Sequence, residues 1–187
     1  EEVPDAALRH KLEPHEPLGC KRVLQTNHWY PTLVRDDVDL LTTGVASFTA
    51  DGVVTDDGRE IPLDTVVWGT GFRTSEFLAP MTITGRDGRD LNDAWVEGAE
   101  AHLGLTDAGF PNLFILYGPN TNLGHNSIIY MIESQTPYVR EAIQWLRRDG
   151  LAWLDVKADV QAEFNDSLQK RLDGTVWAGD CSSWYRN

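Results

Sequence analysis

Two tight-turn sequences divide the segment 45–68 into short β-branched runs. The turns are Asp51-Gly52 and Asp56-Asp57-Gly58, and Asp-Gly pairs adopt the backbone angles of hairpin loops at little steric cost. The runs between these turns have the length and composition of strands: Val45–Phe48, 53–55 and 65–68. The sequence therefore predicts a small β-meander that feeds a buried strand, which ends at Gly69-Thr70-Gly71.

The second half of the chain predicts one more strand and two helices. An apolar run at 113–117 is closed by Gly118-Pro119, and a long helical pattern follows over 126–148. Pro137 lies inside that pattern and removes one helical hydrogen bond, so we expect a kink or a restart near Ser134. Four apolar residues at four-residue spacing predict another helix: Val160, Phe164, Leu168 and Leu172. This order indicates an α/β fold, with a β-meander and parallel-sheet strands followed by C-terminal helices.

The charge balance argues against several classes of protein. The chain has 16 Lys and Arg against 29 Asp and Glu, a net charge of −13, which repels nucleic acid. No apolar run approaches the roughly 20 residues of a membrane-spanning helix. The five histidines lack metal-ligand spacing, so we expect no metal site. Cys20 and Cys181 lie far apart, which predicts no disulfide framework and a cytoplasmic location.

The turn after the predicted strand 65–68 is a first candidate for ligand binding. Thr70, Gly71 and Phe72 follow the carboxyl end of that strand, where α/β sheets place ligands. The turn fails as a dinucleotide fingerprint because Thr74 occupies the third glycine position. A glycine turn after a core strand is the ordinary alternative.

The loop before the long helix is a second candidate, formed by Gly118, Pro119, Asn120, Asn126 and Ser127. Asn126 or Ser127 suits an N-cap, and the free N–H groups of a helix start stabilise negative charge. A polar loop with a capped helix explains the same residues without a ligand.

Two adjacent cations, Lys21 and Arg22, form a third candidate in this acidic chain. Arginine offers a fork of donors to an anion, and lysine is a compact charge that suits phosphate. Taken alone, such a pair is usually a solvated surface patch.

These segments, taken in order, resemble the C-terminal portion of Baeyer–Villiger monooxygenases and related class B flavin monooxygenases. The resemblance extends from about Lys11 to Arg186 and is carried by the runs PLGCKRVLQTNHWYPTL, DVDLL, LDTVVWGTGFRTSEFLAPM, GFPNLFILYGPNTNLGHNSIIYMIE and RLDGTVWAGDCSSWY. It implies a fragment of a flavoprotein with two Rossmann-type dinucleotide-binding domains. Residues 1–20 would be the end of the NADPH domain and a connector, and residues 21–187 an incomplete C-terminal part of the FAD domain.

The resemblance also implies roles for single residues. Lys21 matches the lysine that senses the 2′-phosphate of NADPH, and Arg22 matches the catalytic arginine beside the flavin. Thr70, Gly71 and Phe72 fall on a turn near the FAD, although Gly69 stands where the family usually has alanine. The loop and helix start match residues at the pyrimidine edge of the flavin: Gly118, Pro119, Asn120, Asn126 and Ser127.

The implied activity is an FAD- and NADPH-dependent insertion of one oxygen atom from O2 into a ketone, giving an ester or lactone. An N- or S-oxygenating enzyme of the same class is the nearer alternative. A non-catalytic structural module is the other, since exposed strand edges invite self-association. Neither GxGxxG loop occurs in the chain, so we expect the isolated polypeptide to be inactive and to bind no FAD.

Overall fold

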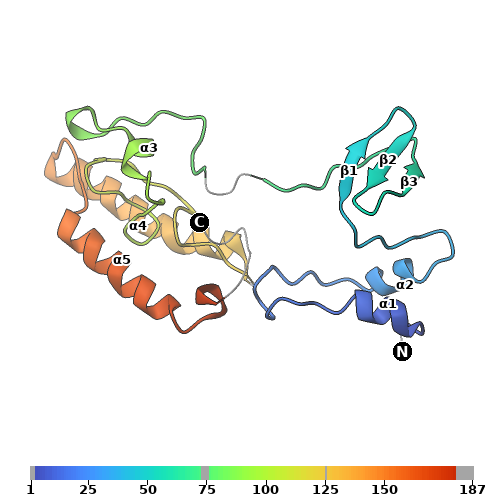
Figure 1. The fold of residues 1–187 in the computed structure, drawn as a ribbon. Coiled ribbons are helices and arrows are strands. Elements are labelled where there is room, and N and C mark those ends of the chain that lie inside the picture. The colour runs from blue at the N-terminus through green and yellow to red at the C-terminus, as the bar shows by residue number, and fades with distance from the viewer. Residues whose placement is uncertain (1–2, 73–75, 125, 180–187) are drawn as a thin grey trace. The chain divides into compact units, whose positions relative to one another are not determined.

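The computed structural model describes residues 3–72, 76–124 and 126–179 (Figure 1). The chain divides into two compact units. Unit 1 comprises residues 1–15 and 24–72, and unit 2 comprises residues 16–23 and 73–187. The elements of unit 1 are α1 (Ala6–Lys11), α2 (Trp29–Leu33), β1 (Val45–Phe48), β2 (Gly52–Thr55) and β3 (Glu60–Pro62). Those of unit 2 are η1 (Arg86–Gly88), α3 (Leu91–Ala94), α4 (Ile128–Asp149), α5 (Ala158–Leu172) and η2 (Val176–Ala178).

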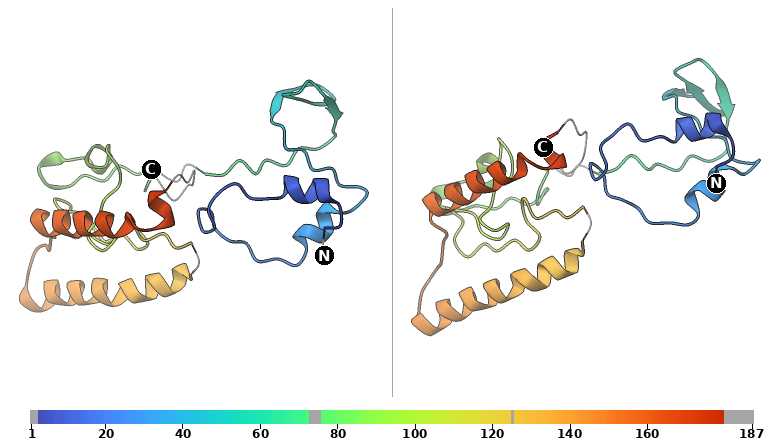
Figure 2. Two further views of the ribbon diagram at one scale, coloured as in Figure 1. Left: turned by 60° about the horizontal axis from the view of Figure 1, so that its bottom comes forward. Right: turned by 90° about the horizontal axis from the view of Figure 1, so that it is seen from below.

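In unit 2, two long helices lie on either side of an irregular stretch of chain, residues 102–121 (Figure 2). Side chains from both helices satisfy its backbone. Gln135 of α4 accepts from the Tyr117 N–H at 2.9 Å, and Gln161 of α5 accepts from the Ala108 N–H at 2.7 Å. The buried apolar residues of this unit are concentrated in or beside this stretch: Leu91, Ala101, Leu105, Phe110, Ile115 and Ala142. The stretch is therefore held by side-chain hydrogen bonds around a small core.

The predicted strand at 113–117 is absent, which corrects the expectation of parallel-sheet strands in this half of the chain. Ile115 N–H donates to the Leu105 carbonyl at 2.8 Å, and Gly118 N–H donates to the Gly104 carbonyl at 3.2 Å. Tyr117 has a φ of 58°, in the left-handed region and far from the extended angles of a regular strand. An apolar run needs a partner with a free edge to become a strand, and the described residues offer this one only scattered hydrogen bonds.

α4 runs without interruption from Ile128 to Asp149, so the predicted restart near Ser134 is wrong. Pro137 lies on the exposed side of the helix, opposite the buried Gln135 and Ala142. The carbonyl that loses its helical donor, that of Glu133, therefore lies on the side that water reaches. Two hydroxyls also bond to the helix backbone nearby: Ser134 Oγ donates to the Tyr130 carbonyl and Thr136 Oγ1 to the Ile132 carbonyl, both at 2.8 Å.

Cys20 lies in the first segment of unit 2, residues 16–23. It is 1% exposed and disulfide-bonded. The sequence has one other cysteine, Cys181, which lies outside the described residues. The prediction of no disulfide is therefore wrong for Cys20. It relied on the long separation of the two cysteines, yet loop-closure entropy grows only slowly with loop length, so separation is a weak argument.

Among residues 3–72, 76–124 and 126–179, no helix combines the length and the apolar character needed to cross a bilayer. Within the same ranges, no group of three or more His, Cys, Asp or Glu side chains is arranged to hold a metal ion.

A buried carboxylate connects three parts of unit 2. Asp107 is 4% exposed and accepts from Trp95 Nε1 at 2.5 Å and from Gln161 Nε2 at 3.1 Å. Trp95 follows α3, and Gln161 belongs to α5. Burial raises the pKa of Asp107, because a charge loses solvation there; the donors Gln161 and Trp95 and the nearby Arg89 lower it in part.

Asp107 should make the stability of unit 2 depend on pH. Its pKa is higher in the folded than in the unfolded chain, so its contribution is fully present below the ordinary value of about 3.9 and is lost as pH rises through the raised folded value. We expect the free energy of unfolding of the wild type, relative to that of Asp107→Asn, to fall as pH increases over this window. Urea unfolding at a series of pH values measures the difference. A difference independent of pH would contradict the assignment.

Unit 1 contains the antiparallel meander that the turn sequences predict, in the order β1-β2-β3. β2 is the central strand, with Val53 paired to Phe48 on one side and to Ile61 on the other. Val53 is 6% exposed and Thr55 2% exposed. The Thr55 hydroxyl bonds to Asp57 and accepts from the Arg59 N–H at 3.2 Å, which fixes the second turn.

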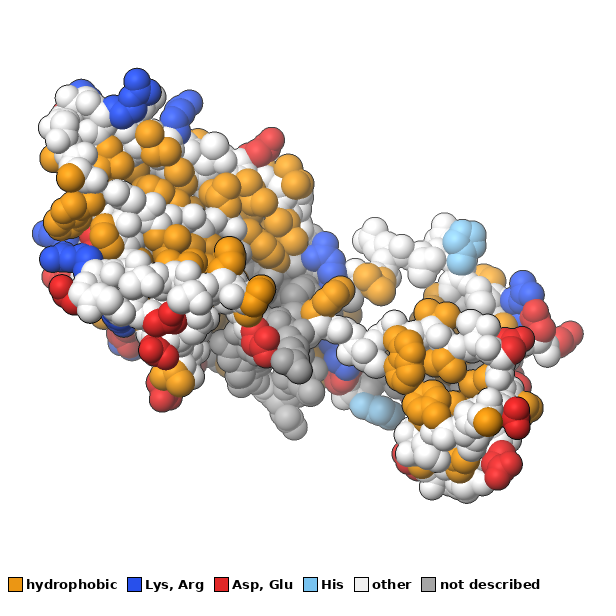
Figure 3. Space-filling model, turned by 90° about the horizontal axis from the view of Figure 1, so that it is seen from above, with side chains coloured by type: hydrophobic (Ala, Val, Ile, Leu, Met, Phe, Trp, Pro, Cys, Tyr) orange, Lys and Arg blue, Asp and Glu red, His pale blue; other side chains and the backbone are white. Residues whose placement is uncertain are grey.

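The predicted buried strand at 65–68 is absent, which is a correction, and the meander ends in a strand that the sequence pattern does not predict, β3. Residues 65–72 are described but not paired in a sheet, and Val67, Trp68 and Phe72 are 89%, 67% and 94% exposed. The Trp68 ring contacts Phe48 with centroids 5.1 Å apart. Apolar side chains at the surface of this unit are visible in Figure 3. A run of buried-strand composition thus lies in water because no described segment pairs with it.

Gly52 should be essential to the meander. A Cβ at this position would lie 2.0 Å from the Ile61 carbonyl oxygen, which is backbone and cannot rotate away. We expect Gly52→Ala to lower the stability of unit 1 by about 1–3 kcal/mol through overpacking. Gly69→Ala is the matched control, because a Cβ there meets nothing within 4 Å. Urea unfolding followed by circular dichroism compares the two variants. Equal unfolding midpoints would show that β2 and β3 move apart at little cost and would contradict the expectation.

Candidate functional site

A tight turn presents Lys21 and Arg22. The Cys20 N–H donates to the Pro17 carbonyl at 3.0 Å, and Gly19, in the third position of the turn, has a φ of 90°. This is the position where a type II turn requires glycine. The reversal of the chain brings the Lys21 ammonium against the Glu16 carboxylate, with both side chains about half exposed.

Arg22 reaches the loop that precedes α4. One guanidinium nitrogen, Nη1, donates to the carbonyl of Leu123 at 2.9 Å, across 101 positions of sequence. The predicted arginine and the predicted loop therefore lie together in unit 2. The side chain is held at one end of its fork by an uncharged acceptor, which leaves its charge without neutralisation by this contact.

Residues 118–124 form a tight backbone structure in which Gly118 and Pro119 are buried. A Cβ at Gly118 would lie 2.5 Å from the Gly104 carbonyl oxygen, so close packing of two chain segments already requires this glycine. Thr121 Oγ1 donates to the Gly118 carbonyl at 2.7 Å, and the Tyr117 hydroxyl bonds to Asn122. Asn120 is exposed with a φ of 61°. The loop is thus fixed from inside while its outer residues remain accessible.

The N-terminus of α4 is capped as the sequence predicts. Ser127 is the N-cap and its Oγ accepts from the Tyr130 N–H at 3.5 Å; Asn126 Oδ1 accepts from the Ser127 N–H at 2.7 Å. Both residues are exposed. The helix has 22 residues, so the positive end of its dipole lies beside the loop that Arg22 contacts. The arrangement suits a ligand that carries or acquires negative charge.

Thr70, Gly71 and Phe72 lie in unit 1, whereas the other predicted site residues lie in unit 2. All three are exposed, and a Cβ at Gly71 would meet nothing within 4 Å. Gly71 has a φ of 89°, a backbone conformation that favours glycine, and this alone explains why glycine occupies the position. The approach of this turn to the loop at 118–127 stays a prediction.

Several residues that complete the arrangement are missed by the sequence reasoning. Glu16 could have been found, because Pro17-Leu18-Gly19 is a turn sequence that brings its flanks together. Gln135 carries no comparable signal. The Trp177 ring, in η2, lies 3.3 Å from the position that a Cβ of Gly124 would take. Val176 Cγ1 lies 3.7 Å from the position that a Cβ of Gly19 would take. η2 therefore contacts both the turn and the loop.

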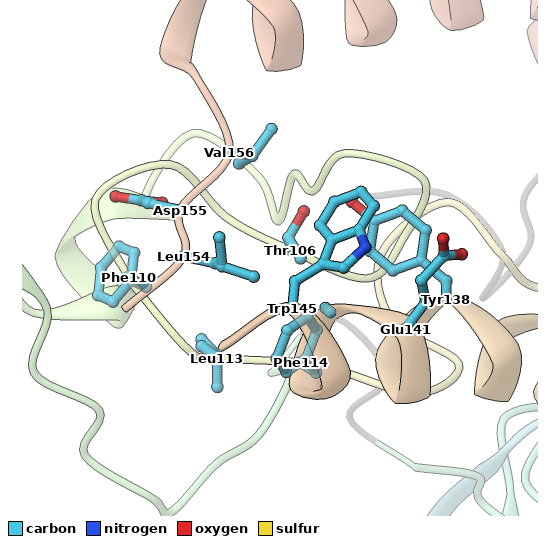
Figure 4. Close-up of a pocket in the computed structure, with 11 residues that line it drawn as sticks. Thr106, Phe110, Leu113, Phe114, Tyr138, Glu141, Trp145, Leu154, Asp155 and Val156 are labelled. Carbon is cyan, nitrogen blue, oxygen red and sulfur yellow. The ribbon is translucent and has the colours of Figure 1, made fainter. Parts of the chain in front are cut away.

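An apolar pocket of about 230 Å³ lies elsewhere in unit 2, between the second half of α4 and the segment before α5 (Figure 4). Phe110, Leu113 and Leu154 line it, with Tyr138 and Trp145 from α4. The carboxylate of Asp155 is occupied as an acceptor for the Gly109 N–H, at 3.2 and 3.3 Å to its two oxygens. The composition of the pocket lining suits a small apolar group.

Comparison with known proteins identifies the class. No family model matches the chain. The chain is 47% identical over 185 residues to a Baeyer–Villiger monooxygenase of Pseudomonas aeruginosa, covering 98% of the chain and 35% of that protein. It is 40% identical to a Baeyer–Villiger monooxygenase of Streptomyces coelicolor, covering 98% of the chain and 36% of that protein.

Solved structures agree. A steroid monooxygenase bound to NADP superposes with a TM-score of 0.89 at 30% identity, over 98% of this chain and 36% of that one. An open structure of cyclohexanone monooxygenase superposes with a TM-score of 0.80 at 27% identity, over 94% of this chain and 36% of that one.

The fold and sequence define a part of a flavoprotein monooxygenase. The chain belongs to the Baeyer–Villiger monooxygenase family and corresponds to its C-terminal portion, spanning about a third of the length of these relatives. The resemblance seen in the sequence is confirmed.

Proposed function

We propose that this chain forms part of an FAD- and NADPH-dependent enzyme that converts a ketone to an ester or lactone. The overall reaction consumes the ketone, O2, NADPH and a proton, and yields the ester, NADP⁺ and water. A polypeptide of the relatives' full length that carries this chain is the complete enzyme. In it we expect two dinucleotide-binding domains, with residues 1–20 ending the NADPH domain and residues 21–187 in the FAD domain.

The contact between Arg22 and Leu123 is the observation that supports this function most strongly. It brings a permanent cation beside the loop that opens a 22-residue helix. In a water-poor site, a fixed cation stabilises negative charge that develops during a reaction. We assign this catalytic role to Arg22. Its guanidinium would stabilise negative charge where oxygen is transferred, and then the negative charge that develops on the ketone oxygen.

The residues present fit a flavin. Gly118 and Pro119 give the loop a close-packed base, Asn120 presents an exposed amide, and Asn126 and Ser127 cap the helix whose N-terminus would face the electron-poor ring. The flavin, when bound, supplies the redox and oxygen chemistry, while the chain binds and orients it. Thr70, Gly71 and Phe72 would contribute a second contact, and Lys21 would bind the 2′-phosphate of NADPH.

The isolated chain would be inactive, and its exposed Val45, Phe48 and Trp68 would favour self-association beside the free edge of β1.

Arg22 is tested by replacing it in the complete enzyme. We expect Arg22→Ala to lower the rate of ketone oxygenation by about 10²- to 10³-fold, which is typical for loss of one group that stabilises a transition-state anion. Flavin reduction by NADPH, followed separately by its absorbance, should change much less. Arg171→Ala, an exposed arginine of α5, is the matched control. Normal ketone oxidation by Arg22→Ala would remove the proposed role.

Oxidation of an amine or sulfide is the second candidate function, because related enzymes of the same class use the flavin in that way. The charge of Arg22, which its contact with the Leu123 carbonyl does not neutralise, favours the ketone reaction, in which an alkoxide-like oxygen develops. We expect the complete enzyme to convert a cyclic ketone to its lactone faster than it oxidises a tertiary amine at equal concentration. Product analysis by gas chromatography decides, and the reverse preference would favour the second function.

A further inference from the structure

The ion pair between Glu16 and Lys21 is built by the turn rather than by chance proximity on a flexible surface. Pro17 is the first residue of the turn, Gly19 supplies the left-handed residue, and the hydrogen bond from Cys20 N–H to the Pro17 carbonyl closes the turn. Cys20 is buried, and Val176 covers the Gly19 side. The backbone that carries both charges is therefore anchored to unit 2, although the side chains themselves remain about half exposed.

A lysine in this position cannot bind a phosphate without a cost. Its ammonium already has an anionic partner, and a phosphate monoester carries a charge of about −1.5 to −2 at neutral pH. An arriving phosphate must displace the Glu16 carboxylate or share the ammonium with it. Sharing leaves two anionic groups close together, which is unfavourable for both. Arg22 does not relieve this competition through its observed contact, because that contact is directed to Leu123.

We propose that Glu16 is a specificity-determining residue that competes with the ribose 2′-phosphate of the nicotinamide coenzyme for Lys21. The inference rests on the proposed function, in which Lys21 binds that phosphate. Glu16 weakens binding of the 2′-phosphorylated coenzyme and leaves binding of the coenzyme that lacks the phosphate almost unchanged. It therefore narrows the preference for NADPH over NADH that Lys21 creates.

The test is equilibrium binding to the complete enzyme, measured by calorimetry with NADP⁺ and with NAD⁺. An exposed ion pair contributes up to about 1 kcal/mol, so Glu16→Gln should tighten NADP⁺ binding by about two- to fivefold. NAD⁺ binding should stay the same within error. The gain should shrink as salt is raised from 0.05 to about 1 M, where screening acts over about 3 Å. Glu13→Gln, another exposed glutamate near the connector, is the matched control and should change neither constant.

The double variant separates this inference from the proposed function. In a Lys21→Ala background, Glu16→Gln should no longer improve NADP⁺ binding, because the competed cation is gone. If Lys21→Ala weakens NADP⁺ binding but Glu16→Gln has no effect on it, the competition is refuted while the role of Lys21 stands. If Lys21→Ala changes neither coenzyme, both the role of Lys21 and the inference fail. An equal gain from Glu16→Gln with and without Lys21 would show only a general effect of charge, and would also overturn the inference.

Discussion

The hydrogen bond from Arg22 to the Leu123 carbonyl connects two parts of unit 2 that are 101 positions apart in the sequence. Without it, the turn that carries two cations and the loop that opens α4 would be separate surface features, each with an ordinary explanation. With it, a permanent charge and a helix N-terminus share one region. An uncharged acceptor positions the arginine and keeps its charge available. A carboxylate in the place of the Leu123 carbonyl would also hold the arginine but would cancel that charge.

The sequence predicts elements well where the information is local. The Asp-Gly turns lead to an antiparallel meander, although its third strand, Glu60–Pro62, is not predicted, and the helical spacing leads to α4 and α5. It fails at 65–68 and 113–117, where the side chains suit a buried strand but no described segment pairs with either run as a strand. Pro137 misleads for a related reason, because its effect depends on which side of the helix faces water.

The candidate site shows the same division. The cap at Ser127 and the glycine at Gly118 follow from local pattern, yet the reason for Gly118 is contact with Gly104, which no pattern reveals. The pairing of Glu16 with Lys21 is local and could have been predicted from the turn between them. Gln135 bonds to Tyr117, just before the loop, and Trp177 approaches Gly124 within it; neither contact follows from a local pattern, so only three-dimensional structure identifies them.

The solvent-exposed apolar segment at 65–72 affects how mutational data on this chain should be interpreted. Val67, Trp68 and Phe72 have the accessibility of solvent-facing positions, and a substitution survey of the isolated polypeptide would rank them as tolerant. Relatives almost three times as long supply additional chain that could cover such residues. In that setting the same positions would behave as core, and polar replacements accepted by the fragment would be rejected by the whole protein.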